Sequence, residues 1–464
     1  MSVERRGVQK IGYGMNMPEQ SPPTSVASLR EGVSPRQVGD VRSRWAWTEA
    51  TVWTTRMLAA LETGVKGGKW YSLIDKVVRE ENLFNGWVRV ASNQGTAGVD
   101  HVTIEGFAKH LASNLKRLHE TLRDGSYRPQ DVLRVEILKL GSKATRPLGI
   151  PTVRDRVVQT ALRNVIEPIF ERTFADHSYG FRPNRGCKDA LRRVDELVKR
   201  GYRYIVDADL KSYFDTIPHD RLMSRIAERI SDQRVLALIE RFLQQGVMEA
   251  MTRWEPTEGT PQGAVISPLL SNIYLDPLDH RMASLGFEMV RYADDFVILC
   301  RTRAEAERAL DEVRQWTADN GLTLHPEKTH IADTEGDGFE FLGYHIRRER
   351  RWPRRKSLQK FKDTIRRKTK RTNGRSLSAI IADINQTLRG WYEYFKHSHP
   401  WIFGSLDGWI RMRLRSILRR RKRRKGRGRG RDHQRYPNAY FREAGLFSLK
   451  DAWLNNVNPL RGTQ

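Results

Sequence analysis

Cysteine is almost absent from the 464-residue sequence, which contains only Cys187 and Cys300. Two cysteines that lie 113 positions apart exclude a disulfide scaffold and a cysteine-rich zinc module, and they fit a reducing compartment. Long apolar runs are also missing: none approaches the ~18 residues of a membrane span, and the N-terminus has no signal-peptide apolar core. We therefore expect an intracellular protein without a membrane partner.

Acidic residues are few relative to basic ones, because 55 Asp and Glu stand against 82 Lys and Arg, a formal net charge of +27. This excess favours a polyanionic partner, such as nucleic acid, over a neutral metabolite. Hydrophobic residues make up 39% of the chain, which is enough for folded domains and argues against wholesale disorder. The length predicts about three domains.

The positive charge is concentrated between Arg347 and Arg431, a stretch with 30 Lys and Arg against 5 Asp and Glu. Its net charge of +25 leaves only +2 for the other 379 residues. A solvated or localisation tail is one interpretation. Against it, Trp391 and Tyr392 lie between two basic clusters at helix-compatible spacing, which suits base stacking, although an aromatic helix face can equally be core. We expect the repeat Gly426–Arg431 to stay mobile until it binds nucleic acid.

Local patterns predict helices with a few strands. Residues 1–45 show no sustained periodicity and predict a flexible leader. Helical patterns begin near Trp53 and continue at Leu73–Val90, Phe107–Leu122, Asp155–Phe170 and Lys188–Lys199. Apolar and polar residues alternate over Val132–Leu140, as in a half-buried strand.

Two further strand-like segments contain acidic residues, which a strand disfavours unless something binds them. In the first, period-two alternation places Ile205, Asp207 and Asp209 on one face. In the second, the adjacent Asp294 and Asp295 interrupt two apolar runs, as at the tip of a tight hairpin.

The acidic pair Asp294 and Asp295 alone could mark an ordinary turn, because Asp is common there. Adjacent like charges repel, however, and a hard divalent cation with oxygen ligands removes that cost. Three carboxylates from two strands suit two Mg²⁺ ions roughly 3.5–4 Å apart, one activating a primer hydroxyl and the other neutralising a leaving pyrophosphate. The residue types indicate nucleotidyl transfer, and their spacing alone does not distinguish a polymerase from a nuclease.

Eight sequence motifs occur in a fixed order: RPLGIPTVRDRVVQTAL (146–162), SYGFRPNRGCKDAL (178–191), DADLKSYFDTIPHD (207–220), TPQGAVISPLLSNIYL (260–275), RYADDF (291–296), GLTLHPEKT (321–329), FEFLGY (339–344) and LRGWYEYFK (388–396). In this order they resemble the group II intron-encoded reverse transcriptase/maturases of bacteria and organelles. The resemblance extends from about Trp53 to Leu454.

The resemblance implies an α+β fold: a right-hand polymerase with fingers and palm, in which helices accompany an antiparallel palm sheet, followed by an α-helical thumb-like maturase domain. The implied domains are a flexible leader (1–45), an N-terminal extension with the start of the fingers (46–140), the reverse transcriptase fingers and palm (141–346), the thumb-like maturase or X domain (347–410) and a basic DNA/RNA-binding tail (411–464).

The resemblance makes Asp209, Asp294 and Asp295 the catalytic residues and the ligands of two Mg²⁺ ions. Asp207 shares their predicted face without being a family ligand, so we expect it behind the ligands or in solvent. The implied dNTP-binding residues are Lys139, Arg146, Phe214 and Gln262. Each has a plainer alternative: surface cations for the first two, core packing for Phe214, and a simple turn for the Pro-Gln-Gly segment.

Nucleic-acid contacts are implied in two regions. The N-terminal finger extension, Ala97–Leu122, is expected to clamp template RNA and to help bind the intron. Further contacts are implied for Lys328, Arg354, Arg355, Arg366, Arg367, Arg389, Trp391, Tyr392, Arg419, Arg420, Arg421, Lys422, Arg423, Arg424 and Lys425. For Lys328, a solvated lysine is the alternative.

The implied function is RNA-directed DNA polymerisation, together with binding of group II intron RNA to assist splicing and intron mobility (retrohoming). The implied partners are the intron RNA, an RNA template, a DNA primer or target DNA, and dNTPs, in the bacterial cytoplasm. Only 33 residues follow Arg431, with one His and no Cys, so we expect no HNH endonuclease. The alternatives are a splicing cofactor without polymerase activity, which the Asp triad argues against, and a domesticated reverse transcriptase in defence or repair.

Overall fold

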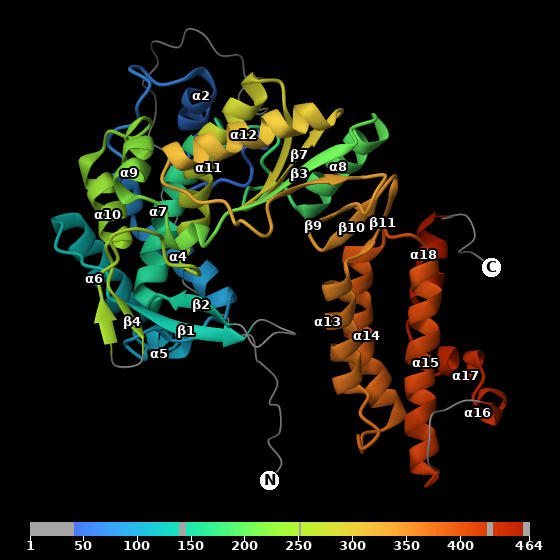
Figure 1. The fold of residues 1–464 in the computed structure, drawn as a ribbon. Coiled ribbons are helices and arrows are strands. Elements are labelled where there is room, and N and C mark those ends of the chain that lie inside the picture. Colours follow the sequence, from blue (N-terminus) through green and yellow to red (C-terminus); the bar gives the residue numbers. More distant parts are fainter. Residues whose placement is uncertain (1–40, 139–144, 250–251, 425–429, 458–464) are drawn as a thin grey trace. The chain divides into compact units, whose positions relative to one another are not determined.

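The structure is a computed structural model that describes residues 41–138, 145–249, 252–424 and 430–457. The chain forms two units, Met1–Ala46 and Trp47–Gln464, and the elements shown in Figure 1 belong to the second. Most of the predicted flexible leader lies outside the described residues, as do Lys139, Lys425 and most of the Gly-Arg repeat. In the described part of the chain, no helix combines the length and the apolar character needed to cross a membrane.

The N-terminal part of the second unit combines helices with a four-stranded sheet of order β2-β1-β4-β5. Strand β1 pairs antiparallel with β2 and parallel with β4. At Gly86 in α4, an added Cβ would lie 2.9 Å from the carbonyl oxygen of Val157 in α7, so glycine lets these helices pack closely. The elements are α2 (Thr55–Thr63), α3 (Ile74–Val77), α4 (Glu80–Ser92), α5 (Ile104–Lys109), α6 (Leu111–Asp124), β1 (Val132–Leu138), β2 (Thr145–Ile150), α7 (Val153–Glu171), β4 (Val247–Glu249) and β5 (Thr252–Trp254).

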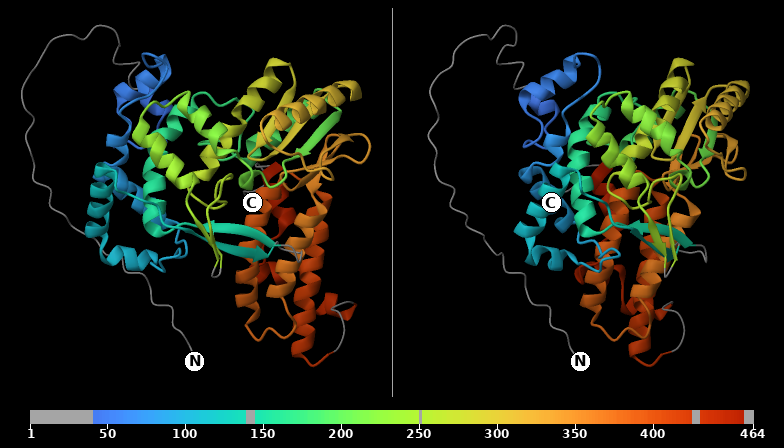
Figure 2. Two further views of the ribbon diagram at one scale, coloured as in Figure 1. Left: turned by 60° about the vertical axis from the view of Figure 1, so that its left-hand side comes forward. Right: turned by 90° about the vertical axis from the view of Figure 1, so that its left-hand side faces the viewer.

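The palm is built on a second four-stranded sheet, entirely antiparallel, of order β6-β7-β3-β8. Helices α11 and α12 contact one side of it, while α8 and the β9–β10 strands pack with Ile205, Val297 and Leu299 on the other. Figures 1 and 2 show this layering. The elements are α8 (Cys187–Lys199), β3 (Tyr204–Asp209), α9 (His219–Ala227), α10 (Gln233–Leu243), α11 (Ser267–Ser284), β6 (Glu288–Tyr292), β7 (Asp295–Cys300), α12 (Arg303–Asp319) and β8 (His330–Asp333). The predicted antiparallel palm is confirmed.

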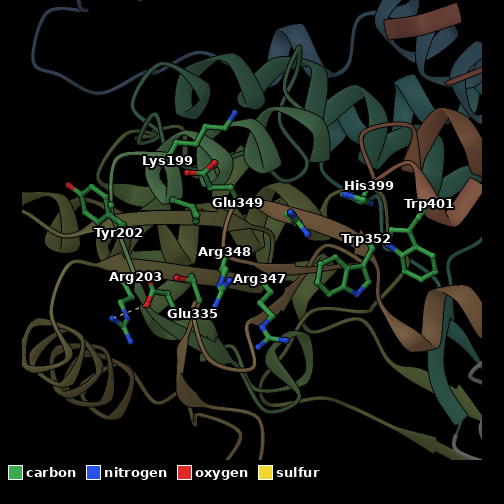
Figure 3. A pocket seen from close by; sticks show the side chains of 14 residues that line it. Lys199, Tyr202, Arg203, Glu335, Arg347, Arg348, Glu349, Trp352, His399 and Trp401 are labelled. Carbon is green, nitrogen blue, oxygen red and sulfur yellow. Dashed lines mark ion pairs between the residues drawn. The ribbon is translucent and has the colours of Figure 1, made fainter. Parts of the chain in front are cut away.

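A small antiparallel sheet of β9 (Phe339–Phe341), β10 (Tyr344–Arg347) and β11 (Arg350–Pro353) follows the palm. The charge change at Arg347, which predicted a domain boundary, falls at the tip of the β10–β11 hairpin, so the sheet continues through it. The first helix of the next domain begins at Arg355. The hairpin tip also lines a cavity of about 890 Å³ (Figure 3).

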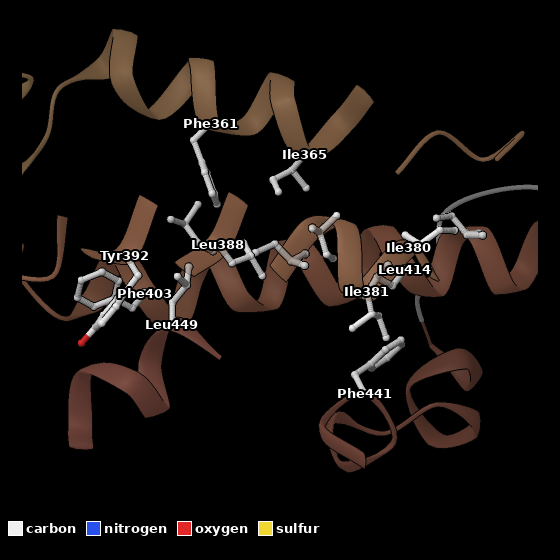
Figure 4. Packing of buried hydrophobic residues seen from close by; sticks show 14 of the residues in the cluster. Phe361, Ile365, Ile380, Ile381, Leu388, Tyr392, Phe403, Leu414, Phe441 and Leu449 are labelled. Atoms are coloured by element: carbon white, nitrogen blue, oxygen red, sulfur yellow. The ribbon is translucent and has the colours of Figure 1, made fainter. Parts of the chain in front are cut away.

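The C-terminal domain is a helical bundle with its own hydrophobic core. Its helices are α13 (Arg355–Lys368), α14 (Leu377–Phe395), α15 (Trp401–Arg421), α16 (Arg431–Arg435), α17 (Asn438–Glu443) and α18 (Leu449–Val457). Figure 4 shows the core that they share, from Phe361 in α13 to Leu449 in α18. The predicted helical domain is present, and it extends beyond residue 410.

The predicted separate tail from residue 411 onward is wrong, because α15 runs without interruption through that boundary. Leu414 and Ile417 are fully buried in the same core as Phe403, which precedes the boundary. Charge misled the prediction because a helix can carry arginines on one face while its other face is core.

Three arginines of α15, in the basic cluster Arg411–Arg431, have structural contacts. Arg415 is 2% exposed and donates from Nε to the carbonyl oxygen of Tyr436 at 2.9 Å. Arg419 pairs with the buried Asp432 at 2.7 Å. Arg413 donates to the carbonyl oxygen of Thr369 at 3.0 Å. Between Arg411 and Arg424, the exposed cations are Arg420, Arg421, Lys422, Arg423 and Arg424, of which Arg421 also donates to the carbonyl oxygen of Arg375.

Trp391 and Tyr392, for which base stacking is predicted, lie in or against the bundle core, and their contact with bases stays a prediction. Tyr392 is 5% exposed, and the ring of Trp391 lies 4.5 Å from that of Phe361 and 4.9 Å from that of Phe395. Both side chains pack in or against the bundle core, which is the alternative that the sequence left open.

We predict that Leu414→Ala lowers the unfolding free energy of the bundle by about 2–5 kcal/mol, because it leaves a cavity in a fully buried position. Arg420→Ala, on the exposed side of the same helix, should change it by less than about 0.5 kcal/mol. Chemical denaturation followed by circular dichroism measures both. Equal denaturation midpoints for Leu414→Ala and the wild type would show that residues from 411 onward are not part of the bundle core.

Candidate active site

The two acidic strand segments meet at one edge of the palm sheet. Strand β3 ends at Asp209, and β7 begins at Asp295, which is its direct partner in the antiparallel register. Asp294 occupies the two-residue turn between β6 and β7. Side chains directly opposite each other have Cβ atoms roughly 4.5–5.5 Å apart, so the structure brings the predicted carboxylates together.

The hairpin turn itself is strained. Ala293, its first residue, has φ +60°, a left-handed conformation that favours glycine. The turn predicted for Asp294 and Asp295 is therefore confirmed, and it coexists with a crowded carboxylate site. The two interpretations of the sequence do not exclude each other.

The carboxylates at this edge repel one another in a partly buried place. Burial, followed by the charges of Asp207, Asp294 and Asp209, raises the pKa of Asp295 to about 7. Burial raises the pKa of Asp207 to about 6, with His330 opposing the shift and Asp209 and neighbouring Glu340 adding to it. Asp207 is thus half-buried behind the site, and the solvated alternative for it is wrong.

A lysine reaches this carboxylate group. Nζ of Lys328, in the turn before β8, donates to Oδ2 of Asp209 at 2.5 Å. In this arrangement the described residues contain no group of three or more His, Cys, Asp or Glu side chains already placed as metal ligands. The donor set nevertheless fits a hard divalent cation, because carboxylate oxygens are its preferred ligands and Asp295 stands among other carboxylates, whose charges add to the effect of burial on its pKa.

A buried ion pair holds the acidic turn in place. Arg291 and Asp279 are both 0% exposed, and Nε of Arg291 donates to Oδ1 of Asp279 at 2.8 Å. Nη1 of Arg291 donates to the carbonyl oxygen of Ala293 at 3.0 Å and to Oδ1 of Asn272 at 2.9 Å. One guanidinium therefore connects helix α11 to the turn that contains Asp294.

A second segment supports the same hairpin from its edge. The amide of Tyr179 donates to the carbonyl oxygen of Arg291 at 2.8 Å, extending the pairing of β6. At Gly180, an added Cβ would lie 2.2 Å from the amide nitrogen of Ala293. Only glycine permits this approach, so the SYGFRP motif positions the acidic turn.

The sequence analysis missed these supporting residues. Arg291 stands in an otherwise apolar strand and Asp279 in a largely buried helix, and an unpaired charge at either place would be costly. A charged residue in an otherwise apolar strand or helix was therefore the one sequence feature that could have indicated a buried ion pair. The sequence did not show that the two charges, twelve positions apart, neutralise each other.

Backbone hydrogen bonds bring two of the predicted dNTP-binding segments together. Strand β2 contains Arg146, and the amide of Gly149 in the same strand donates to the carbonyl oxygen of Gln262 at 2.7 Å. Gly263 has φ +114°, and an added Cβ would lie 2.6 Å from the Gly149 oxygen. The Pro-Gln-Gly segment is therefore a turn that also lies directly against the strand of Arg146. The dNTP contact predicted for Lys139 falls outside the described residues.

Phe214 lies in the turn that follows β3, within the short 3-10 helix Tyr213–Asp215. Its carbonyl oxygen accepts from the amide of Thr260 at 2.6 Å, which connects it to the segment of Gln262. The side chain is 8% exposed and makes an edge-on contact with the ring of Tyr213. Core packing describes this contact, and selection of deoxyribose by Phe214 stays a prediction.

Two protein families match successive parts of the chain. The family described as "Reverse transcriptase (RNA-dependent DNA polymerase)" matches residues 137–346. The family described as "Group II intron, maturase-specific domain" matches residues 358–436. The first match contains the carboxylate edge, and the second contains most of the helical bundle.

Curated relatives agree with these matches. Protein YkfC of Escherichia coli (strain K12) is 35% identical over 325 residues, which is 62% of this chain and 84% of YkfC. The group II intron-encoded protein LtrA of Lactococcus lactis subsp. cremoris is 38% identical over 217 residues, 46% of this chain and 36% of LtrA. An uncharacterized 91 kDa protein in the cob intron of Schizosaccharomyces pombe is 28% identical over 341 residues, 59% of this chain and 42% of that protein. The alignments thus span most of YkfC and less than half of the other two proteins.

We predict that Asp279→Ala destabilises the palm by about 3–5 kcal/mol, because it leaves Arg291 buried and unpaired. The double variant Arg291→Met with Asp279→Leu should recover a large part of that stability, because it removes both charges together. Its amides at Ala293 and Asp294 should still exchange hydrogen faster than in the wild type, because the Ala293 carbonyl has lost its donor.

Thermal unfolding and hydrogen exchange of the same three proteins separate the two effects. If the double variant regains stability and also wild-type exchange, Arg291 does not hold the turn. If Asp279→Ala unfolds at the same temperature as the wild type, the ion pair does not contribute to the stability of the palm.

Proposed function

Because the chain belongs to the family of group II intron-encoded reverse transcriptase/maturases, we propose that it extends a DNA primer with dNTPs on an RNA template and assists the splicing of an intron RNA. The observation that carries the polymerase part is the register of Asp209 opposite Asp295, with Asp294 in the adjoining turn, inside the reverse transcriptase match. This is a nucleotidyltransferase arrangement on an antiparallel palm.

Asp209, Asp294 and Asp295 are the proposed ligands of two Mg²⁺ ions. When bound, such ions activate the primer hydroxyl and neutralise the charge that develops on the transferred phosphate. Support comes from the pKa of Asp295, which burial and then the neighbouring carboxylates raise to about 7; a divalent cation relieves the repulsion among these carboxylates. Lys328 donates a hydrogen bond to the carboxylate of Asp209 and offsets part of its negative charge.

The incoming dNTP occupies the space between β2 and the turn after β3 in this proposal. Arg146 binds its phosphates as a bidentate cation, and Lys139 adds a second positive charge. Phe214 and Gln262 contact its sugar and base. The backbone bonds between the strand of Arg146 and the segment of Gln262 support this grouping.

The helical bundle binds the intron RNA, and its match to a maturase domain supports this assignment. The exposed cations of the bundle include Arg355, Arg366, Arg367, Arg389 and the cluster Arg420–Arg424, which we propose as its phosphate contacts. Arg354 is half-buried and lies 3.6 Å from Glu340, so it joins the bundle to the palm more than it offers charge to RNA. The same protein and RNA then serve intron mobility into a DNA target in the bacterial cytoplasm.

Primer extension on an RNA template with dNTPs and Mg²⁺ tests the polymerase proposal. We predict that Asp294→Ala and Asp295→Asn each lower the extension rate by at least about a thousandfold, because two-metal catalysis loses a ligand. With chelator present at pH 8, Asp295→Asn should melt at a higher temperature than the wild type, because it removes one of the crowded negative charges.

The melting measurement is the control for folding, since a variant that is inactive and also more heat-stable has not simply unfolded. Arg303→Gln, on the exposed outer surface of α12, is the matched neutral variant and should extend primers at the wild-type rate. Extension by Asp294→Ala at that same rate would end the polymerase proposal.

We predict that changing Arg420, Lys422, Arg423 and Arg424 to Gln weakens binding of intron RNA and slows assisted splicing, while short-primer extension changes little. Each lost phosphate contact should lower the slope of log affinity against log salt by about 0.7–0.9. Filter binding across a salt series measures the slope, and a splicing assay at fixed salt measures the function.

Arg419 is excluded from this variant because its pairing with Asp432 is structural. A matched control changes four exposed cations on palm helices to Gln: Arg192, Arg303, Arg308 and Arg314. An unchanged salt slope for the bundle variant, or an equal loss in the control, would show that the cluster is only a solvated surface.

A further inference from the structure

A cavity of about 890 Å³ lies at the junction of the palm, the β10–β11 hairpin and the helical bundle (Figure 3). Its lining residues come from four segments: the link from α8 to β3, the turn after β8, the hairpin tip, and the connection between α14 and α15. This volume falls in the range of roughly 300–1,000 Å³ in which proteins bind small ligands, a size that suits one or two nucleotides.

The cavity is at the opposite end of β3 from the catalytic carboxylates. Its lining includes Arg203, one residue before β3 begins, whereas Asp209 is the last residue of that strand. At about 3.3 Å per residue, the strand separates the two places by roughly 20 Å. The cavity is therefore distinct from the proposed polymerase site.

Backbone hydrogen bonds fix the walls relative to one another. The amide of Thr334 donates to the carbonyl oxygen of Arg203 at 3.0 Å, and the amide of Arg348 donates to that of Thr334 at 2.7 Å. The amide of His399 donates to the carbonyl oxygen of Arg351 at 2.8 Å, which ties the bundle to the hairpin. All four segments thus join through main-chain bonds, and the cavity does not depend on mobile side chains for its shape.

The charges of the lining divide into paired and unpaired groups. Arg203 is bound by Asp333 at 2.7 Å and by Glu335 at 3.2 Å, and Lys199 is bound by Asp195 at 3.0 Å. At the hairpin tip the side chains of Arg347, Arg348 and Arg350 form no ion pair with any described residue, and Glu349 is the one acidic side chain among them. The tip therefore presents a net charge of +2 to the cavity, in a form suited to phosphate.

Two tryptophans lie at the same end of the cavity as His399 in Figure 3. Trp401 is 60% exposed, which is unusual for a large aromatic side chain that has no partner to cover it. Trp352 is half-buried and lies 5.1 Å from His345, ring centre to ring centre. Nδ1 of His399 is buried and has no hydrogen-bond partner among the described residues. Aromatic faces beside free guanidinium groups are the combination that binds unpaired bases and their phosphates.

We propose that this cavity binds a short unpaired stretch of nucleic acid, with a base stacked on Trp401 and its phosphates held by Arg348 and Arg350. The bound strand is separate from the template–primer hybrid at the carboxylates. The proposal requires no polymerase activity and depends only on the cavity and its lining.

Binding of a labelled oligoadenylate of about six nucleotides to the full-length protein tests it by fluorescence anisotropy. An unlabelled RNA–DNA hybrid is present in excess, so that the catalytic cleft is filled. Trp401→Ala should weaken oligonucleotide binding by about tenfold, the usual effect of losing one stacked base. Arg348→Gln with Arg350→Gln should lower the log–log salt slope by about 1.4, or 0.7 for each lost contact on a single strand.

Matched controls lie elsewhere on the surface. Tyr71→Ala removes an aromatic side chain that is 69% exposed, and Arg303→Gln with Arg314→Gln removes two exposed cations from α12. Both control proteins should bind the oligonucleotide as the wild type does. Photocross-linking of the bound oligonucleotide should label the peptides that contain Trp352 or Trp401.

The proposal is overturned if Trp401→Ala and the double arginine variant bind like the wild type, if the controls lose as much affinity, or if a double-stranded RNA binds equally well. RNA and DNA forms of the same oligonucleotide identify which nucleic acid the cavity binds. Tighter binding of RNA indicates the intron or the template, and equal binding indicates that the cavity accepts a single strand of RNA or of DNA. Primer extension by the same variants, expected at the wild-type rate, is read separately. If the wild type does not extend primers, the polymerase proposal fails, while the proposal that the cavity binds nucleic acid still stands or falls by the anisotropy measurements.

Discussion

The buried ion pair between Arg291 and Asp279 is the interaction on which the geometry of the active site depends. Removing two charges from water costs several kcal/mol for each ion, so the pair can persist only because its hydrogen bonds are well satisfied. The guanidinium meets this requirement with Asp279, Asn272 and the Ala293 carbonyl oxygen. The last of these contacts is the functional one. It fixes a strained turn, and the turn determines where Asp294 and Asp295 stand relative to Asp209.

A second constraint is the distribution of charged side chains, which differs between the palm and the helical bundle. In the palm, several carboxylates share one partly buried edge, and burial followed by their mutual repulsion raises the pKa of Asp295, an arrangement that suits a hard divalent cation. In the bundle, part of the positive charge is consumed internally, since Arg415 and Arg419 hold α15 against the segment from Asp432 to Asn438. The net charge of a sequence segment therefore overstates the charge that is available to a nucleic acid.

Local patterns predicted the parts of the structure that depend on neighbours in sequence. Alternation placed Asp209 in a strand, and an acidic pair between two apolar runs predicted the hairpin tip. The close approach of Gly180 to Ala293 could not be predicted, because nothing in either segment specifies its distant partner. The two alternatives for Trp391 have the same origin. An aromatic residue beside cations fits a binding surface and a core equally well, and only the packing of α13 on α14 distinguishes them.

The palm and the bundle are joined by direct contacts between α14 and the segment that contains Leu342 and Tyr344. The hydroxyl of Tyr344 donates to the carbonyl oxygen of Tyr394 at 2.6 Å, and the hydroxyl of Tyr394 donates to that of Leu342 at 2.7 Å. Phe395, the last residue of α14, is buried in the palm-side core. These contacts leave little freedom for α14 to move without disturbing the sheet behind the carboxylates. The bundle is therefore held at a fixed position relative to the catalytic edge, and α14 is the helix that connects the two.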